Sequence, residues 1–143
     1  MMSLGIFQPG VRSLGYYIAR TVSRPFAAVI ADLTARLAAH GFGLLTDIDV
    51  QATLKTKIGA DMPKYRILGA CNPRFAHEAL KLEDKLGVLL PCNVIVRETA
   101  DGRVEIASID PVASMERTES PALKATAEEV CRLLSKSLAE VGE

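Results

Sequence analysis

The segment that most constrains the fold is Ala100-Asp101-Gly102-Arg103, which separates two runs rich in β-branched residues. Asp-Gly between two such runs is typical of a two-residue β-hairpin, because both central residues of a type I′ turn need positive φ. The segment therefore predicts that a strand over 92–99 pairs with an antiparallel strand that follows it. A chain that contains this hairpin fits the α+β class better than a fully parallel sheet with helices on both faces.

A two-residue turn also fixes the register of the expected hairpin. It pairs Val94 with Ile109 and joins Cys92 to an apolar face of the sheet. The same register sets Glu98 opposite Glu105, so we expect this pair of like charges where water screens it.

The rest of the chain gives the element order β-α-β-(α)-β-α-β-β-α. Apolar residues at helical or alternating spacing identify the elements, and N-capping residues, prolines and glycines mark their ends. The expected ranges are a strand at 15–22, a helix at 25–40, a strand at 42–49, a short helix at 50–58, a strand at 65–70, a helix from 73 to about 86, and a last helix at 121–139. With 143 residues, we expect a loose N-terminal arm over 1–13 and a single α+β domain over 14–143.

The composition excludes several classes of function. Seventeen basic residues balance seventeen acidic ones, and seven aromatic residues without a tryptophan are a poor platform for stacking bases. We therefore expect no nucleic-acid partner. The N-terminus lacks the features of a signal peptide and no apolar run is long enough to span a membrane, which predicts a cytoplasmic protein without membrane contact. Three cysteines and two histidines without metal-ligand spacing predict neither a disulfide framework, nor a metal site, nor a cofactor.

The candidate site consists of two Cys-Asn pairs at strand ends, Cys71-Asn72 and Cys92-Asn93. A thiolate is the best nucleophile and soft-metal ligand in the chain, and Asn side chains at strand ends can line a pocket. The structural alternative is that both cysteines are small buried hydrophobic residues. Asn72 also fits the N-cap of the helix that starts at Pro73, whereas Asn93 either bonds a neighbouring backbone or faces a ligand.

The geometry of the two strands decides whether the thiols can act together. In a right-handed βαβ crossover the strands would be parallel, and Cys71 and Cys92 would lie at opposite ends of the sheet. Antiparallel strands, with the helix laid across one end, would bring the two thiols together. Both arrangements are compatible with the sequence.

Three segments carry a family resemblance: Gly69-Ala70-Cys71-Asn72-Pro73, Leu89-Leu90-Pro91-Cys92-Asn93-Val94, and Asp110-Pro111. Through them the sequence resembles a bacterial family known as "domain of unknown function 302". The resemblance implies a curved, mainly antiparallel sheet with helices on one side, similar to a single copy of the TATA-binding-protein-like fold. It also implies a homodimer whose biochemical role is not established, and it favours the antiparallel arrangement of the two Cys-Asn pairs.

These observations lead to three hypotheses about function. The first is a homodimer that binds a small ligand non-catalytically, because no catalytic constellation is assembled in the sequence. The second is a thiol-dependent enzyme or redox sensor that uses Cys71 and Cys92. The third is a structural module for protein interaction. The identity of a ligand and the physiological process stay open at this point.

Overall fold

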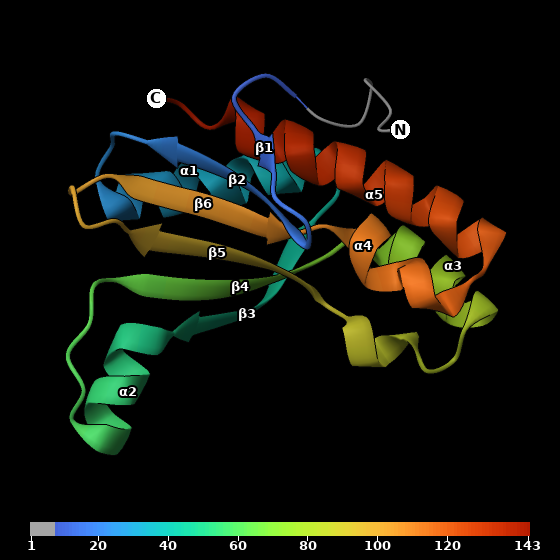
Figure 1. The fold of residues 1–143 in the computed structure, drawn as a ribbon, viewed down its shortest axis with the longest axis horizontal. Coiled ribbons are helices and arrows are strands. Elements are labelled where there is room, and N and C mark those ends of the chain that lie inside the picture. The colour runs from blue at the N-terminus through green and yellow to red at the C-terminus, as the bar shows by residue number, and fades with distance from the viewer. Residues whose placement is uncertain (1–7) are drawn as a thin grey trace.

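The computed structural model describes residues 8–143, which form one six-stranded antiparallel sheet with five α-helices (Figure 1). The strands lie in the order β1-β2-β6-β5-β4-β3, and each pair of neighbours is antiparallel. The strands are β1 (Arg12–Ser13), β2 (Tyr17–Val22), β3 (Gly43–Asp49), β4 (Tyr65–Cys71), β5 (Cys92–Glu98) and β6 (Val104–Ile109). The helices are α1 (Phe26–Ala39), α2 (Val50–Ile58), α3 (Pro73–Leu82), α4 (Pro111–Met115) and α5 (Pro121–Glu140), with 3₁₀ turns η1 (Leu86–Leu89) and η2 (Glu116–Thr118). The fold is therefore α+β, as the sequence predicts.

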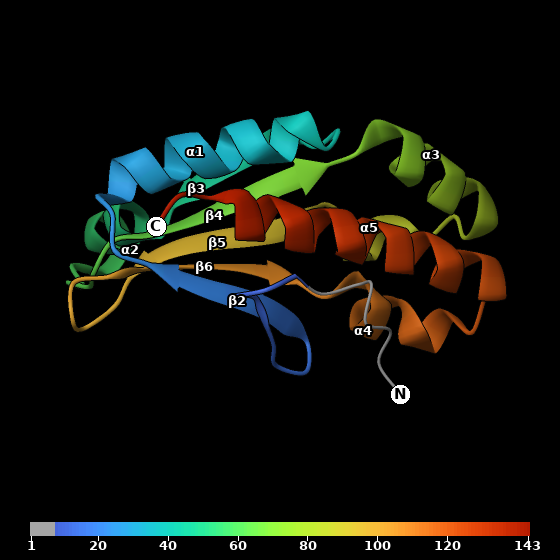
Figure 2. The same ribbon diagram turned by 90° about the horizontal axis from the view of Figure 1, so that it is seen from above.

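Helices α1 and α5 cover one face of the sheet (Figure 2). Each helix carries apolar residues three or four positions apart, which places them on a single side of the helix. The main core combines these residues with alternate residues of the strands: Val29, Leu33 and Leu37 of α1, Val130, Leu134 and Leu138 of α5, and Ile18, Leu68, Val94, Val96 and Ile106 of the sheet. No helix of residues 8–143 covers the opposite face, which Figure 1 turns toward the viewer.

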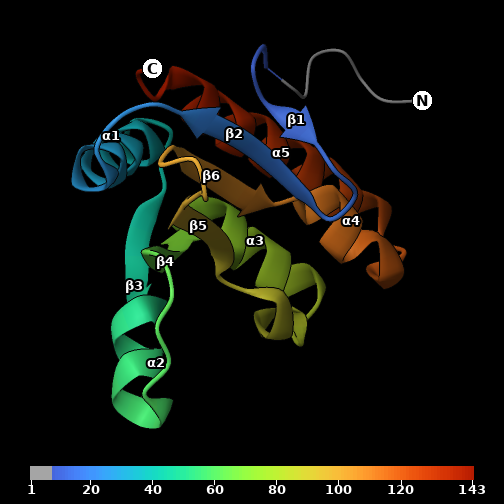
Figure 3. The same cartoon turned by 60° about the vertical axis from the view of Figure 1, so that its left-hand side comes forward.

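A second apolar cluster lies beyond one end of the sheet. It joins Ala79 of α3, Leu86 of η1, Met115 of α4, and Leu123 and Ala127 of α5. Because α5 is 20 residues long, it contributes to both clusters and connects them. Helix α2 extends away from the other end of the sheet and buries none of its residues (Figure 3).

The buried Arg20 on β2 fixes the C-terminal end of α5. Its guanidinium donates to the carbonyl oxygens of Leu138 at 2.8 Å and Ala139 at 3.2 Å, and also to that of Val141. The last carbonyls of a helix lack partners within the helix, and a cation there is favoured by the helix dipole. One arginine therefore holds the end of α5 against the sheet.

The predicted hairpin exists, but its register differs from the prediction by one residue. Val94 pairs with Ser108 instead of Ile109, and Arg97 instead of Glu98 lies opposite Glu105. The Arg97 Nε donates to the Glu105 Oε1 at 2.7 Å, so the expected like-charge pair is replaced by an ion pair. Asp101 does not adopt the positive φ that a type I′ turn requires. The turn is longer than two residues and is not of type I′.

Two other features also differ from the prediction, the end of one helix and the N-terminal arm. Helix α3 ends at Leu82 rather than beside Gly87, and the chain continues through η1. Within the expected loose arm, Arg12 and Ser13 form β1 and pair with β2; residues 1–7 lie outside the described residues. The bounds of α2 agree with the prediction, because Asp49 accepts from the Ala52 amide and Gly59 ends the helix in the left-handed conformation.

None of the helices in residues 8–143 combines the length and apolar character that crossing a membrane requires.

Candidate functional site

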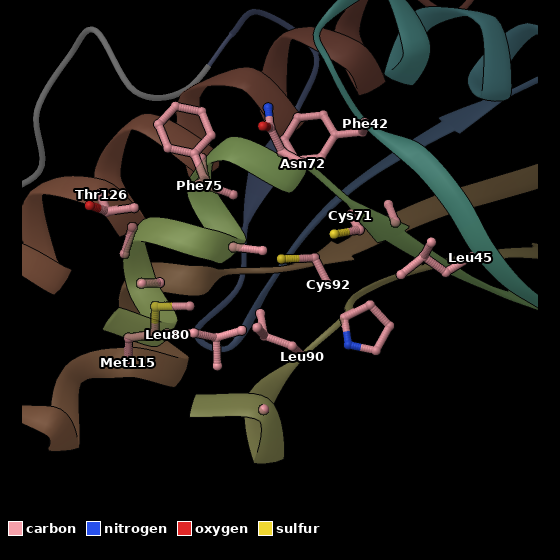
Figure 4. Close-up of a pocket in the computed structure, with 17 residues that line it drawn as sticks. Phe42, Leu45, Cys71, Asn72, Phe75, Leu80, Leu90, Cys92, Met115 and Thr126 are labelled. Atoms are coloured by element: carbon pink, nitrogen blue, oxygen red, sulfur yellow. The ribbon is translucent and has the colours of Figure 1, made fainter. Parts of the chain in front are cut away.

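The antiparallel sheet brings the two cysteine motifs to the same place. Strand β4 ends at Cys71 and β5 begins at Cys92, and Ala70 lies directly opposite Cys92. Of the two arrangements that the sequence allows, the structure has the one in which the thiols approach each other. Figure 4 shows both sulfur atoms directed toward the same cavity.

The cavity has a volume of about 330 Å³ and lies at the end of the sheet, between α3, η1 and α5. Its size is at the lower end of the range for small-molecule sites. Its inner wall consists of buried side chains, and its rim of half-buried or exposed ones. The lining residues are Phe42, Leu45, Ala70, Cys71, Asn72, Phe75, Ala76, Ala79, Leu80, Gly87, Leu90, Pro91, Cys92, Met115, Thr126, Ala127 and Val130.

The cavity exists because the two apolar clusters do not meet completely. Phe42, Cys92 and Val130 come from the main core, while Ala79 and Met115 come from the second cluster. Alanines occupy several positions of the wall where a larger apolar residue would fill the space. Their short side chains leave an apolar volume open between the sheet and α3.

The cavity lining contains no charged side chain among the described residues. Two side chains, Asn72 and Thr126, carry oxygen or nitrogen, and both have backbone partners. The Asn72 Nδ2 donates to the His40 carbonyl at 3.5 Å, and the Thr126 hydroxyl donates to the Ala122 carbonyl at 3.1 Å. A buried charge without a partner is costly, so this site suits an uncharged, apolar molecule.

Asn72 connects two elements instead of capping α3. It occupies the N-cap position, but its side chain makes no capping hydrogen bond, contrary to the prediction. Its amide reaches the turn between α1 and β3, where Gly41 has a φ of 90°. A Cβ on Gly41 would lie 2.9 Å from the Asn72 Nδ2. Glycine is therefore required there both by the backbone conformation and by the close approach of Asn72.

The two buried thiols, Cys92 and Cys131, are kept in the protonated form. Burial, with a smaller contribution from the charge of Cys71, raises the pKa of Cys92 from 9.0 to about 11. Burial and the neighbouring Asp110 carboxylate raise the pKa of Cys131 to about 12. A nucleophilic cysteine needs a thiolate at working pH, and neither residue meets this condition near neutrality.

Asn93 does not belong to this site. It follows Cys92 in β5, so its side chain points to the opposite face of the sheet. There it is exposed beside Ile95 and Ile109. The predicted set is therefore divided: Cys71, Asn72 and Cys92 share the cavity, and Asn93 lies on the uncovered face.

Two other side chains that carry metal-binding or acid-base groups are paired with neighbouring residues. His40 Nε2 lies 2.8 Å from the Glu140 Oε1, and Asp47 pairs with Arg66. Within residues 8–143, no three His, Cys, Asp or Glu side chains are grouped so that they could hold a metal ion.

The Cys-Asn motifs do not predict most of the residues that line the cavity. Phe75 and Ala79 are expected from the helical spacing as ordinary core residues, and Phe42 as part of a strand. Alanines on the inner sides of two helices, such as Ala76, Ala79 and Ala127, are the signal that a wall lacks bulk. That signal becomes useful only when it is known which helix faces the end of the sheet.

Comparison with known proteins agrees with this architecture. Residues 18–141 match the family described as "Domain of unknown function DUF302". The chain is also similar to a protein of solved structure, described as "uncharacterized conserved protein DUF302 from Bacillus stearothermophilus". The two share 28% sequence identity with a TM-score of 0.84, over 90% of this chain and 100% of the other. No curated protein matches the sequence. The chain belongs to the DUF302 family.

Proposed function

We propose that the protein is a homodimeric module that binds a small, uncharged, apolar molecule in the cavity beside Cys71 and Cys92, without transforming it. The observation that carries this proposal is the cavity of about 330 Å³ whose lining has no charged side chain among the described residues. An apolar ligand gains free energy in such a space in proportion to the surface that it removes from water.

The shape of the site supports binding rather than chemistry. Leu45 is 66% exposed and Leu80 is 38% exposed, and both stand at the rim, so an apolar molecule can enter over an apolar edge. Cys92 lies in the wall with its pKa raised to about 11, so it contributes sulfur surface and no thiolate. The uncovered face of the sheet supports the second part of the proposal, the homodimer.

The thiol hypothesis keeps one supporting observation, since Cys71 and Cys92 share the cavity. Paired action would require both residues to form thiolates or a disulfide. The protonated state of Cys92 slows either route at neutral pH, so we place binding first.

Calorimetric titration with straight-chain probes tests the proposal. From 1-butanol to 1-octanol, affinity should rise about fourfold for each CH₂ that enters the cavity, because each buried CH₂ contributes ~0.8 kcal/mol. Octanoate and octylammonium should both bind at least about tenfold more weakly than 1-octanol, since neither charge finds a partner. Tighter binding of either charged probe, or no uptake of any probe, would contradict the proposal.

A further inference from the structure

The uncovered face of the sheet carries its side chains in rows, because alternate residues of adjacent strands line up. The register of the strands places one row across β2, β6, β5, β4 and β3. Over these five strands the row is apolar and consists of Ala19, Ala107, Ile95, Ile67 and Ile48, and it ends on β1 at Arg12, which pairs with Ala19. Its two alanines are buried, whereas Ile48 is 46% exposed. A continuous apolar stripe on an uncovered face is typical of an interaction surface.

The side chains of the stripe differ in how far they rise above the sheet, so the stripe has a low half and a high half. Alanines on β2 and β6 form the low half, and isoleucines on β5, β4 and β3 form the high half. A hollow of about 420 Å³ lies on the face over β5 and β6, beside both Ala107 and Ile95, with Tyr16 and Tyr17 among its lining residues. The two tyrosine rings pack edge to face with their centroids 4.9 Å apart, which gives the hollow an ordered aromatic wall.

The next row places opposite charges on the two central strands. Arg97 of β5 lies directly opposite Glu105 of β6, and their side chains are paired at 2.7 Å. Arg12 reaches the same carboxylate at 3.4 Å. The central strands therefore carry a positive group on the high side of the stripe and a negative group on the low side.

We propose that this face packs against the same face of a second copy, with the two-fold axis parallel to the strands and between β5 and β6. The proposal rests on the homodimer of the proposed function and assigns a surface to it. Such an axis lays β6 over the partner's β5 and β2 over the partner's β4. Closed two-fold interfaces are self-complementary in this way.

This arrangement matches large side chains with small ones and opposite charges with each other. Ile95 lies over the partner's Ala107, and Ile67 lies over the partner's Ala19. Arg97 lies over the partner's Glu105, so the two Arg97 and the two Glu105 side chains alternate near the axis, and the Arg12 of each copy lies on the outer side of its own Glu105. The high half of each stripe fills the hollow of the other copy, as the facing side chains of two sheets interdigitate when they pack ~10 Å apart.

The extent of the face is compatible with a dimer. Five strands ~4.8 Å apart and three rows ~6.7 Å apart cover roughly 500 Å² in projection. Side-chain relief increases the accessible area above the projected area, toward the ~800 Å² that a standard interface buries on each partner. The ligand cavity lies at the end of the sheet on the side of α3 and α5, so both copies keep it open.

Sedimentation equilibrium on the full chain tests this surface. Ile95→Lys and Ile67→Lys should each raise the dissociation constant of the dimer at least about 100-fold, because each places a charge in an apolar contact. Ile58→Lys on α2 and Val88→Lys in η1 are matched controls. Ile58 is 74% exposed and Val88 is 86% exposed, and both lie outside the proposed interface. The controls should leave the constant unchanged, and circular dichroism establishes that each variant is folded.

The charge pair tests the position of the axis. Arg97→Glu and Glu105→Arg should each weaken the dimer about tenfold or more, and the double variant should recover it. A monomeric wild type at ~50 µM would overturn both this surface and the homodimer. A dimer that tolerates both lysine variants would overturn the surface alone. Binding of 1-octanol by the folded lysine variants reports separately on the cavity.

Discussion

Unfolding in urea should show that the protein loses about 4 kcal/mol of stability between about pH 8 and about pH 10.5. The cause is the pair of buried thiols, since the fold raises the pKa of Cys92 to about 11 and that of Cys131 to about 12 from an ordinary value of 9.0. Below about pH 8 both thiols are protonated in the folded and the unfolded chain, and stability is unaffected. Above it the unfolded chain releases two protons that the folded chain retains, and unfolding becomes easier.

Single replacements separate this effect from other alkaline titrations. Cys92→Ala and Cys131→Ala should each reduce the loss by about 2 kcal/mol, although each also lowers stability at neutral pH by removing packed atoms. Val29→Ala, which removes packed atoms from α1 without removing a thiol, should shift the whole curve and keep its slope. Urea titrations under reducing conditions give the free energy at each pH. A slope that neither cysteine variant changes would show that the thiols ionise freely in the folded protein.

Filling the cavity should abolish ligand binding without unfolding the protein. Ala76 of α3 lines the cavity and is only half-buried, so Ala76→Phe directs a ring into a space of about 330 Å³. Affinity for 1-octanol should fall at least about 100-fold, because the ring removes the volume that the alkyl chain would occupy. The melting temperature should change little, since the ring fills an existing void.

The matched control for this prediction is Ala38→Phe on α1. Ala38 is exposed and lies outside the cavity lining, so the variant carries the same cost in helix propensity and should bind like the wild type. Calorimetric titration of the three proteins decides the outcome. Undiminished binding to a folded Ala76→Phe protein would place the ligand elsewhere.

The elements that follow local rules could be predicted from the sequence. Asp49 and Gly59 mark the two ends of α2, and Ser120 caps α5 by accepting from the Leu123 amide. In each case a side chain or a glycine acts on backbone groups a few residues away. The α+β class followed from the hairpin, even though its register was wrong. Asp-Gly also fits longer turns, and here the Thr99 hydroxyl accepts from the Arg103 amide within one.

The candidate site could be predicted only in part. The two motifs were expected to form one site, yet the alternation of side chains in β5 sends Cys92 and Asn93 to opposite faces. That rule was available from the sequence and argued against grouping them. The role of Asn72 was not available, because its partner at His40 lies 32 positions away. The cavity depends on how α3 meets the end of the sheet, which no local pattern encodes. The likeness to the TATA-binding-protein-like fold and the cytoplasmic location stay predictions.

Mass spectrometry of organic extracts tests whether the protein carries an apolar molecule in its cavity. Wild-type protein and the Ala76→Phe variant are purified in parallel, without detergent, from the cells in which the protein occurs naturally. We expect an uncharged, apolar molecule to be enriched in the wild-type extract and missing from that of the variant. An enriched molecule that carries a charge, or equal extracts from two folded proteins, would contradict this expectation.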